Sequence, residues 1–221
     1  MKWLQQVFLS SIGCKAVMAI TGLFMGFFLI GHVAGNLLVF GGPDAINQYA
    51  KGLRDVWPLL WVARSGLILI IILHIYAAIR LTRLNKKAKP ITSSVAKPVQ
   101  ASLSSRTMML SGFVILSFII YHLAHLTFKV THPEFENLAP GDVYQMLIIS
   151  FKSPVVSLFY IISVSLLMLH LSHGISSLFQ TLGLNHPKYN IFIRRFGPIF
   201  SFLLAASFLS VPISILLGWV A

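Results

Sequence analysis

Five long apolar segments, separated by shorter polar stretches, recur along the chain. Each is about 20 residues or longer, which is the length a helix needs to cross the hydrocarbon core of a bilayer. The pattern predicts an all-α membrane protein with a bundle of five transmembrane helices and a single domain over residues 1–221. We expect these helices over residues 15–40, 58–84, 106–130, 154–180 and 197–220.

Turn residues and prolines punctuate this pattern. Residues 41–44 form a turn cluster after the first segment, and Pro154 starts the fourth segment in the first helical turn, where proline is favoured. The polar residues 47–54 predict a brief surface helix, and residues 85–105 predict a basic, flexible connection. Pro212, inside the last segment, predicts a local kink.

The composition agrees with a membrane protein, because 57% of the residues are hydrophobic and only 10% are charged. The net charge of +12 would suit nucleic acid, but the basic residues cluster where apolar segments end, as topology signals do. We therefore expect no nucleic-acid partner. The single cysteine, Cys14, excludes an intrachain disulfide.

Charge also predicts the orientation in the membrane. With five spans, the N-terminus shares its side with most of the Lys and Arg residues, whereas all five acids lie on the other side. The positive-inside rule then predicts a cytoplasmic N-terminus and an extracytoplasmic C-terminus. The basic residues on the N-terminal side are Lys2, Lys15, Arg80, Arg83, Lys86, Lys87, Lys89, Lys97, Arg106, Lys188, Arg194 and Arg195.

Histidines occur at a matched depth in the first four segments, which is notable because ionisable residues within a membrane are usually functional. Each lies 16 or 17 residues after its segment enters the membrane: His32, His74, His122 and His170. Because successive segments run in opposite directions, His32 and His122 should share an outer layer. His74 and His170 should share an inner layer.

Two histidines that face each other across a helix bundle suit bis-imidazole ligation of haem iron, so two layers predict two b-type haems. Each neutral ring offers one nitrogen to iron and donates with the other. Small residues near the histidines would let the helices approach a flat macrocycle. These are Gly22, Gly26, Gly31, Ala34, Gly35, Ala77, Ala78, Gly112 and Gly174.

Other uses of the histidines remain open at this point. His125 and His173 each follow a predicted ligand by three residues, and either could be the ligand instead. Their different depth favours a supporting or pocket-lining role. A zinc site built from His32, His122 and His125 is the metal alternative, but no acid or second cysteine lies within the membrane to complete it. His132 and His186 precede prolines in loops, and we expect both to be solvated.

The chain carries Thr21-Gly22 ahead of His32, Ser111-Gly112 ahead of Tyr121-His122, His74 in the second segment, and Pro154 followed by His170 and Gly174. With these motifs it resembles, over essentially its whole length, the membrane anchor of succinate:quinone oxidoreductases. More narrowly, it resembles the five-helix dihaem cytochrome b558 family shared by succinate:menaquinone reductases and quinol:fumarate reductases. The resemblance implies that His32, His74, His122 and His170 are the axial ligands.

The resemblance also implies a bacterial inner (cytoplasmic) membrane, partners and a function. Such subunits dock on a flavoprotein and an iron–sulfur subunit, and they pass electrons through two haems to or from membrane quinone, typically menaquinone. Succinate or fumarate chemistry belongs to the partners, because this chain has no flavin fingerprint and no cysteine cluster. Two alternatives remain: a dihaem cytochrome b of another oxidoreductase, such as a hydrogenase or formate dehydrogenase, and a transporter or proton channel with a histidine relay.

Quinone should bind near a haem edge, where polar groups meet lipid. The inner candidates are Ser10, Ser11, Lys15 and Arg83, and the outer candidates are Asn36, Arg64 and Lys129. No Asp or Glu lies within the five apolar segments, so the sequence predicts no intramembrane carboxylate relay.

Overall fold

The computed structural model describes residues 10–88, 107–184 and 186–221, and every regular element in these ranges is a helix. Five of the described helices are long and apolar enough to cross a membrane. The predicted all-α, multi-pass architecture is therefore confirmed. The spans are α2 (Ser11–Leu37, extended by the 3₁₀ helix η1, Leu38–Gly41), α4 (Trp57–Ala88), α6 (Met108–His122, extended by the π-helix η2, Leu123–Thr127), α8 (Pro154–Thr181) and α9 (Asn190–Leu216).

Helix ends differ from the predicted ones where capping or polar residues extend a helix. The Ser10 side chain accepts a hydrogen bond from the Gly13 N–H at 3.0 Å, which starts α2 before the expected residue 15. The second span continues to Ala88, so the beginning of the connection predicted over residues 85–105 is helical. The rest of that connection, residues 89–105, lies outside the described residues. The last span begins earlier than predicted and continues through Pro212 without ending.

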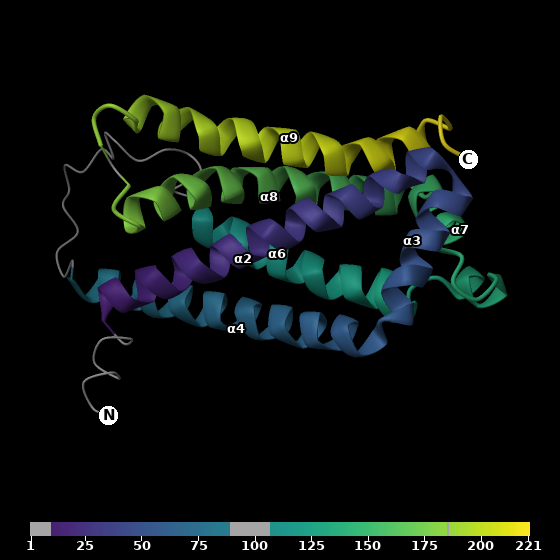
Figure 1. Cartoon of the computed structure of the whole chain (residues 1–221), viewed down its shortest axis with the longest axis horizontal. Coiled ribbons are helices and arrows are strands. Elements are labelled where there is room, and N and C mark those ends of the chain that lie inside the picture. The colour runs from purple at the N-terminus through teal and green to yellow at the C-terminus, as the bar shows by residue number, and fades with distance from the viewer. Residues whose placement is uncertain (1–9, 89–106, 185) are drawn as a thin grey trace.

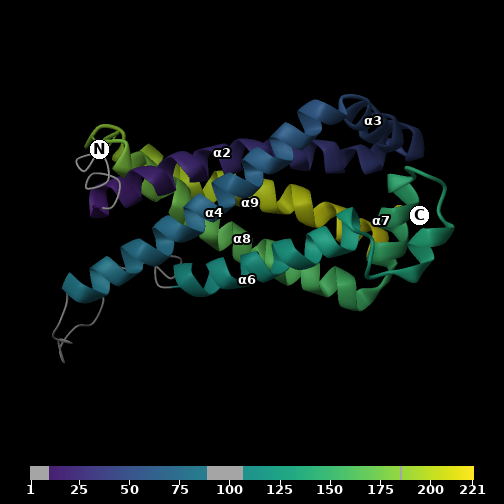
Figure 2. The ribbon, with the colours of Figure 1, turned by 90° about the horizontal axis from the view of Figure 1, so that it is seen from below.

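The five spans run along the long axis of the molecule, and two short helices lie across one end (Figures 1 and 2). These are α3 (Pro43–Asp55) and α7 (Val143–Lys152), with the 3₁₀ helix η3 (Pro133–Asn137) beside them. The brief helix predicted over residues 47–54 is thus confirmed as part of the longer α3. In contrast, α7 was not predicted; its apolar residues are mostly buried.

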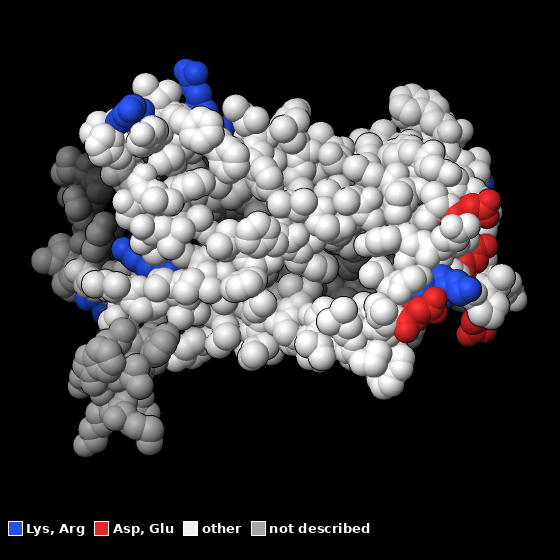
Figure 3. All heavy atoms as spheres, viewed as in Figure 1, with Lys and Arg blue, Asp and Glu red and all other residues white. Residues whose placement is uncertain are grey.

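Charge divides the two ends of the bundle (Figure 3). We call the end that carries α3, η3 and α7 the acidic end, because it holds Asp44, Asp55, Glu134, Glu136 and Asp142. The opposite, basic end holds the start of α2, the end of α4 and the start of α9. Its described basic residues are Lys15, Arg80, Arg83, Lys86, Lys87, Lys188, Arg194 and Arg195.

Hydrogen bonds of the Asn47 side chain link α3 to α7 at the acidic end. Its side-chain oxygen accepts from the N–H groups of Val143 at 2.8 Å and Tyr144 at 3.1 Å, and its amide donates to Asp142 at 3.1 Å. Asp142 in turn caps α7 by accepting from the Gln145 N–H. These bonds satisfy the first free N–H groups of α7, so this short helix can be buried at little cost.

The main hydrophobic cluster also lies at the acidic end, where α7 packs against α3, α8 and α9. Its buried members are Val39, Ile46, Tyr144, Leu147, Ile148, Phe151, Val156, Tyr160, Val211 and Ile215. At the other end, α8 and α9 approach closely through Gly197, where an added Cβ would come within 2.9 Å of the Ser172 carbonyl oxygen.

Candidate functional site

His74 on α4 and Thr21 on α2 form the first polar contact of the bundle interior. Thr21 Oγ1 lies 2.9 Å from His74 Nδ1. The threonine hydroxyl has only one hydrogen, and it donates that hydrogen within α2, where the Val17 carbonyl oxygen is 2.6 Å away. Nδ1 of His74 must therefore be the donor. In a neutral ring this leaves Nε2 without a hydrogen and free to bind a metal.

Ser111 and His170 repeat this arrangement on α6 and α8. Ser111 Oγ lies 3.2 Å from His170 Nδ1 and donates to the Met108 carbonyl at 3.1 Å. The next residue, Gly112, faces the ring, because a Cβ built there would lie 3.8 Å from His170 Cε1. Gly22, which follows Thr21, faces His74 in the same way, with a distance of 3.7 Å.

The rings of His74 and His170 belong to one layer toward the basic end. His173 lies one turn after His170 on α8. His74, His170 and His173 are all partly buried. Both members of the pair predicted for the inner layer thus lie toward this end, each with an Nδ1–hydroxyl contact behind its ring.

A second layer toward the acidic end contains His32 and His122. Their ring centroids are 5.8 Å apart and the rings are nearly perpendicular, at 88°. The His32 ring stacks on Phe28, with centroids 5.2 Å apart, and contacts Phe208 of α9 at 5.8 Å. His122 Nδ1 lies 3.2 Å from the hydroxyl of Tyr160 on α8. The pair predicted for the outer layer is thus side by side.

His125 shares Tyr160 with His122, because its Nδ1 lies 3.0 Å from the same hydroxyl. It sits in the π-helix η2, a helix type that often marks functional positions. The His125 side chain is fully buried, with 0% exposure. Its Nε2 has no hydrogen-bond partner within the described part of the chain.

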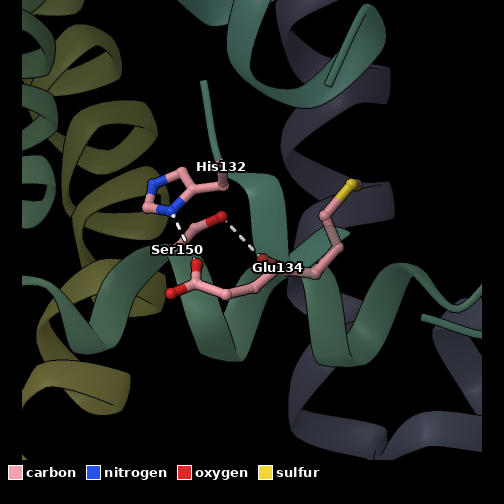
Figure 4. Close-up of polar contacts among 4 residues, drawn as sticks. His132, Glu134 and Ser150 are labelled. Carbon is pink, nitrogen blue, oxygen red and sulfur yellow. Dashed lines mark hydrogen bonds and ion pairs between the residues drawn. The ribbon is translucent and has the colours of Figure 1, made fainter. Parts of the chain in front are cut away.

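The expectation of a solvated loop is wrong for His132. Its ring lies on His125, with centroids 5.0 Å apart, and against Phe135 at 5.2 Å. Its side chain is only 17% exposed, and Nδ1 is 3.3 Å from a Glu134 carboxylate oxygen (Figure 4). The loop around η3 folds back over η2, which an isolated loop sequence cannot reveal. The same expectation is confirmed for His186, which is exposed.

The zinc alternative finds no support in the geometry. Across residues 10–88, 107–184 and 186–221, no group of three or more His, Cys, Asp or Glu side chains is arranged to hold one metal ion. His125 turns its Nδ1 to Tyr160 and is covered by His132, so it does not complete a site with His32 and His122.

The surroundings of these pairs fit a flat, apolar group such as a haem. All four rings are partly exposed, and a Cβ added at Gly26, Gly31 or Gly174 would meet nothing within 4 Å. Gly35 departs from the expectation of macrocycle contact. A Cβ there would come 2.7 Å from Tyr49, so Gly35 lets α3 pack on α2.

The inner quinone candidates are all at the basic end. Ser11 and Lys15 are exposed at the start of α2, and Ser10 uses its hydroxyl as the helix cap. Arg83 is exposed and lines a shallow groove made by α4 residues alone, which includes none of the other three. The role of these residues as a quinone site stays a prediction.

The outer quinone candidates lie near the acidic end, and each is in a different environment. Asn36 donates to the carbonyl oxygen of His32 at 2.8 Å, which holds it against the histidine layer. The Arg64 guanidinium lies 5.5 Å from the centre of the Trp61 ring. Lys129 is exposed and adopts a left-handed backbone conformation, with φ of 58°, where the chain leaves η2.

Sequence reasoning missed one site residue, Tyr160, and gave no role to two others, Thr21 and Ser111. A tyrosine within an apolar span is a signal, because a buried hydroxyl needs a hydrogen-bond partner. In comparisons with protein-family models, curated proteins and solved structures, nothing matches this chain.

Proposed function

We propose that this chain is the dihaem cytochrome b membrane anchor of a succinate:quinone oxidoreductase, either a succinate dehydrogenase or a quinol:fumarate reductase. In this proposal His32 and His122 hold the outer haem b, and His74 and His170 hold the inner one. The haems supply one-electron carriers between an iron–sulfur subunit and membrane quinone, typically menaquinone. A flavoprotein subunit carries out the succinate or fumarate chemistry.

The observation that carries the proposal is the hydrogen bonding behind the inner histidines. Thr21 and Ser111 each donate to a backbone carbonyl of their own helix, so each can only accept from the histidine. Both contacts leave Nε2 as the free nitrogen. An outer partner that fixes the tautomer and orientation of the ring is the usual accompaniment of metal-ligating histidine.

The charge distribution supports the proposed orientation and partners. The basic end is rich in exposed Lys and Arg, as expected for the cytoplasmic side of a bacterial inner membrane. An iron–sulfur subunit docked there would lie next to the layer of His74 and His170. The N-terminus is then cytoplasmic and the C-terminus extracytoplasmic, and electrons pass between the inner and outer layers.

A histidine-relay transporter fits the interior less well. Tyr160 and His170 mark the two layers on α8 and are ten residues apart, which corresponds to about 15 Å along a helix. A hydrogen-bond relay needs polar groups over that distance. The hydroxyls available on this stretch of α8, from Ser163 and Ser165, donate to carbonyls of their own helix.

The test is to purify the complex from native membranes through a tag on this chain and to add substrates to the oxidised protein. We expect a flavoprotein and an iron–sulfur subunit to co-purify, and succinate to reduce the haem absorption bands. Formate and hydrogen should leave the bands oxidised. Reduction by formate or hydrogen, with no response to succinate, would instead assign the chain to another respiratory oxidoreductase.

A further inference from the structure

Tyr160 is the only described hydroxyl that contacts two histidines at once. Its oxygen lies 3.2 Å from His122 Nδ1 and 3.0 Å from His125 Nδ1. The side chain is 5% exposed and is held by edge-on contacts with Phe118 and Phe151, with centroids 5.0 and 4.9 Å apart. A tyrosine hydroxyl has one hydrogen, so it can donate to only one of the two histidines.

The direction of these bonds follows if His122 holds iron through Nε2, which rests on the proposed function. Nδ1 of His122 then carries the hydrogen and donates to Tyr160 Oη. Tyr160 must donate its own hydrogen to His125 Nδ1. The hydrogen of the neutral His125 ring is therefore on Nε2, the atom without a partner among the described residues.

We propose that Tyr160, backed by His125, is a positioning residue for the outer haem: it fixes His122 and sets how strongly that imidazole donates electrons to iron. A ligand whose N–H is held by a good acceptor is a more basic ligand. A more basic axial ligand favours the oxidised iron, and hydrogen bonding around a haem is one of the means by which proteins set its potential.

Tyr160 becomes a better acceptor because it donates to a histidine nitrogen, since hydrogen bonds in a chain strengthen one another in a dry interior. The structure excludes water from this chain of hydrogen bonds. His132 and Phe135 both contact the His125 ring, at centroid distances of 5.0 and 5.7 Å, and the His125 side chain is fully buried.

Within the described residues, no such chain of hydrogen bonds is present behind the inner histidines. There the acceptors are the hydroxyls of Thr21 and Ser111, and each of them donates to a neutral backbone carbonyl. The acceptors behind the proposed inner and outer ligands therefore differ in kind. This difference gives the two haems separate means of setting their potentials.

The test is a potentiometric titration of both haems in the purified complex, together with the haem content. We expect Tyr160→Phe to retain two haems and to shift one midpoint potential upward, because the acceptor for His122 is lost. The matched control is Tyr121→Phe, which removes the same atom from a tyrosine whose ring is 5.3 Å from His125. Tyr121→Phe should leave both potentials unchanged.

Variants of His125 distinguish an effect of the hydrogen-bond chain from an effect of packing. His125→Phe should shift the same haem upward by less than Tyr160→Phe does, since Tyr160 remains but loses its acceptor. His125→Gln should restore much of the wild-type potential, because the amide oxygen can accept from Tyr160. Ser111→Ala should shift the other haem, which assigns the two titration steps.

The proposal is overturned if Tyr160→Phe binds two haems with wild-type potentials. If Tyr160→Phe loses haem, the His125→Phe variant is the deciding test. A wild-type midpoint potential of the outer haem in His125→Phe also overturns the proposal. Wild-type complex without haem would refute the proposed function itself. Wild-type complex with two haems and an unshifted Tyr160→Phe variant would refute only this inference.

Discussion

The hydroxyl oxygen of Thr21 lies 2.9 Å from Nδ1 of His74 on the neighbouring span. Ser111 stands in the same relation to His170, at 3.2 Å. Both hydroxyl residues are followed by a glycine, and both precede another span histidine by eleven residues, His32 and His122 respectively. The helix pairs α2–α4 and α6–α8 thus use one sequence pattern to orient one histidine ring each.

Thr21→Val should weaken binding of the inner haem. The substitution keeps the shape of the side chain but removes the hydroxyl that accepts from the Nδ1–H of His74, which costs about 1–3 kcal/mol. This corresponds to roughly 5- to 150-fold weaker haem binding, measured by haem retention during titration with a haem-scavenging protein. Ser117→Ala is the control, because Ser117 donates only to its own helix at the Phe113 carbonyl. Equal haem retention in Thr21→Val and wild type would contradict the assigned role.

The loss of haem on substitution of the four paired histidines should follow their assignment to two layers. Each single change to Ala should remove one haem of the two, because iron loses an axial ligand. The double variant His32→Ala/His122→Ala should also retain one haem, whereas His32→Ala/His74→Ala should retain none. Haem content per chain is the measurement.

His125→Ala and His173→Ala serve as controls for these variants and should retain both haems. Loss of the outer haem in His125→Ala, with retention in His122→Ala, would reverse the assignment within that pair. A His32→Ala/His74→Ala variant that still holds one haem would place those two residues on the same haem and contradict the layers.

The orientation predicts which end of the bundle reagents can reach from outside the cell. A cysteine at Glu136, on the acidic end, should react with a membrane-impermeant maleimide in spheroplasts. A cysteine at Lys87, on the basic end, should react only after lysis. The native Cys14 is 2% exposed, so the unsubstituted protein is the low-background control. The opposite labelling pattern would invert the proposed topology.

Gly197→Ala should destabilise the packing of α8 on α9. Its Cβ would lie 2.8 Å from Ser176 Oγ and 2.9 Å from the Ser172 backbone oxygen, and such overpacking costs about 1–3 kcal/mol. Alanine regains part of this through its better helix propensity. We expect a lower thermal unfolding midpoint in detergent. Gly66→Ala, where the Cβ would meet nothing within 4 Å, should match or exceed wild type.

The spans were predictable from the sequence because each apolar run is long enough to cross a bilayer, and no tertiary information is needed to see that. The pairing of His32 with His122 followed from depth and alternating direction. The same reasoning could not find α7, since a ten-residue apolar helix is too short to span. Its signal was the capping residue Asp142 before an apolar run.

The polar partners of the histidines could not be predicted from the sequence, because they depend on tertiary contacts. Ser111 and His170 are 59 residues apart in the chain, and Tyr160 and His122 are 38 apart. Periodicity within one helix cannot select such pairs. The burial of His132 likewise depends on how its loop folds over η2, and the π-helix itself changes which face His125 presents.

The haem content per chain is the most direct test of the dihaem assignment. Protein purified from its native membrane should give the pyridine haemochrome spectrum of haem b, with about two haems per chain, one for each histidine pair. His74→Ala and His122→Ala should each give about half of that value, because each removes a ligand from a different layer. A wild-type protein that is fully folded and contains no haem would contradict the account.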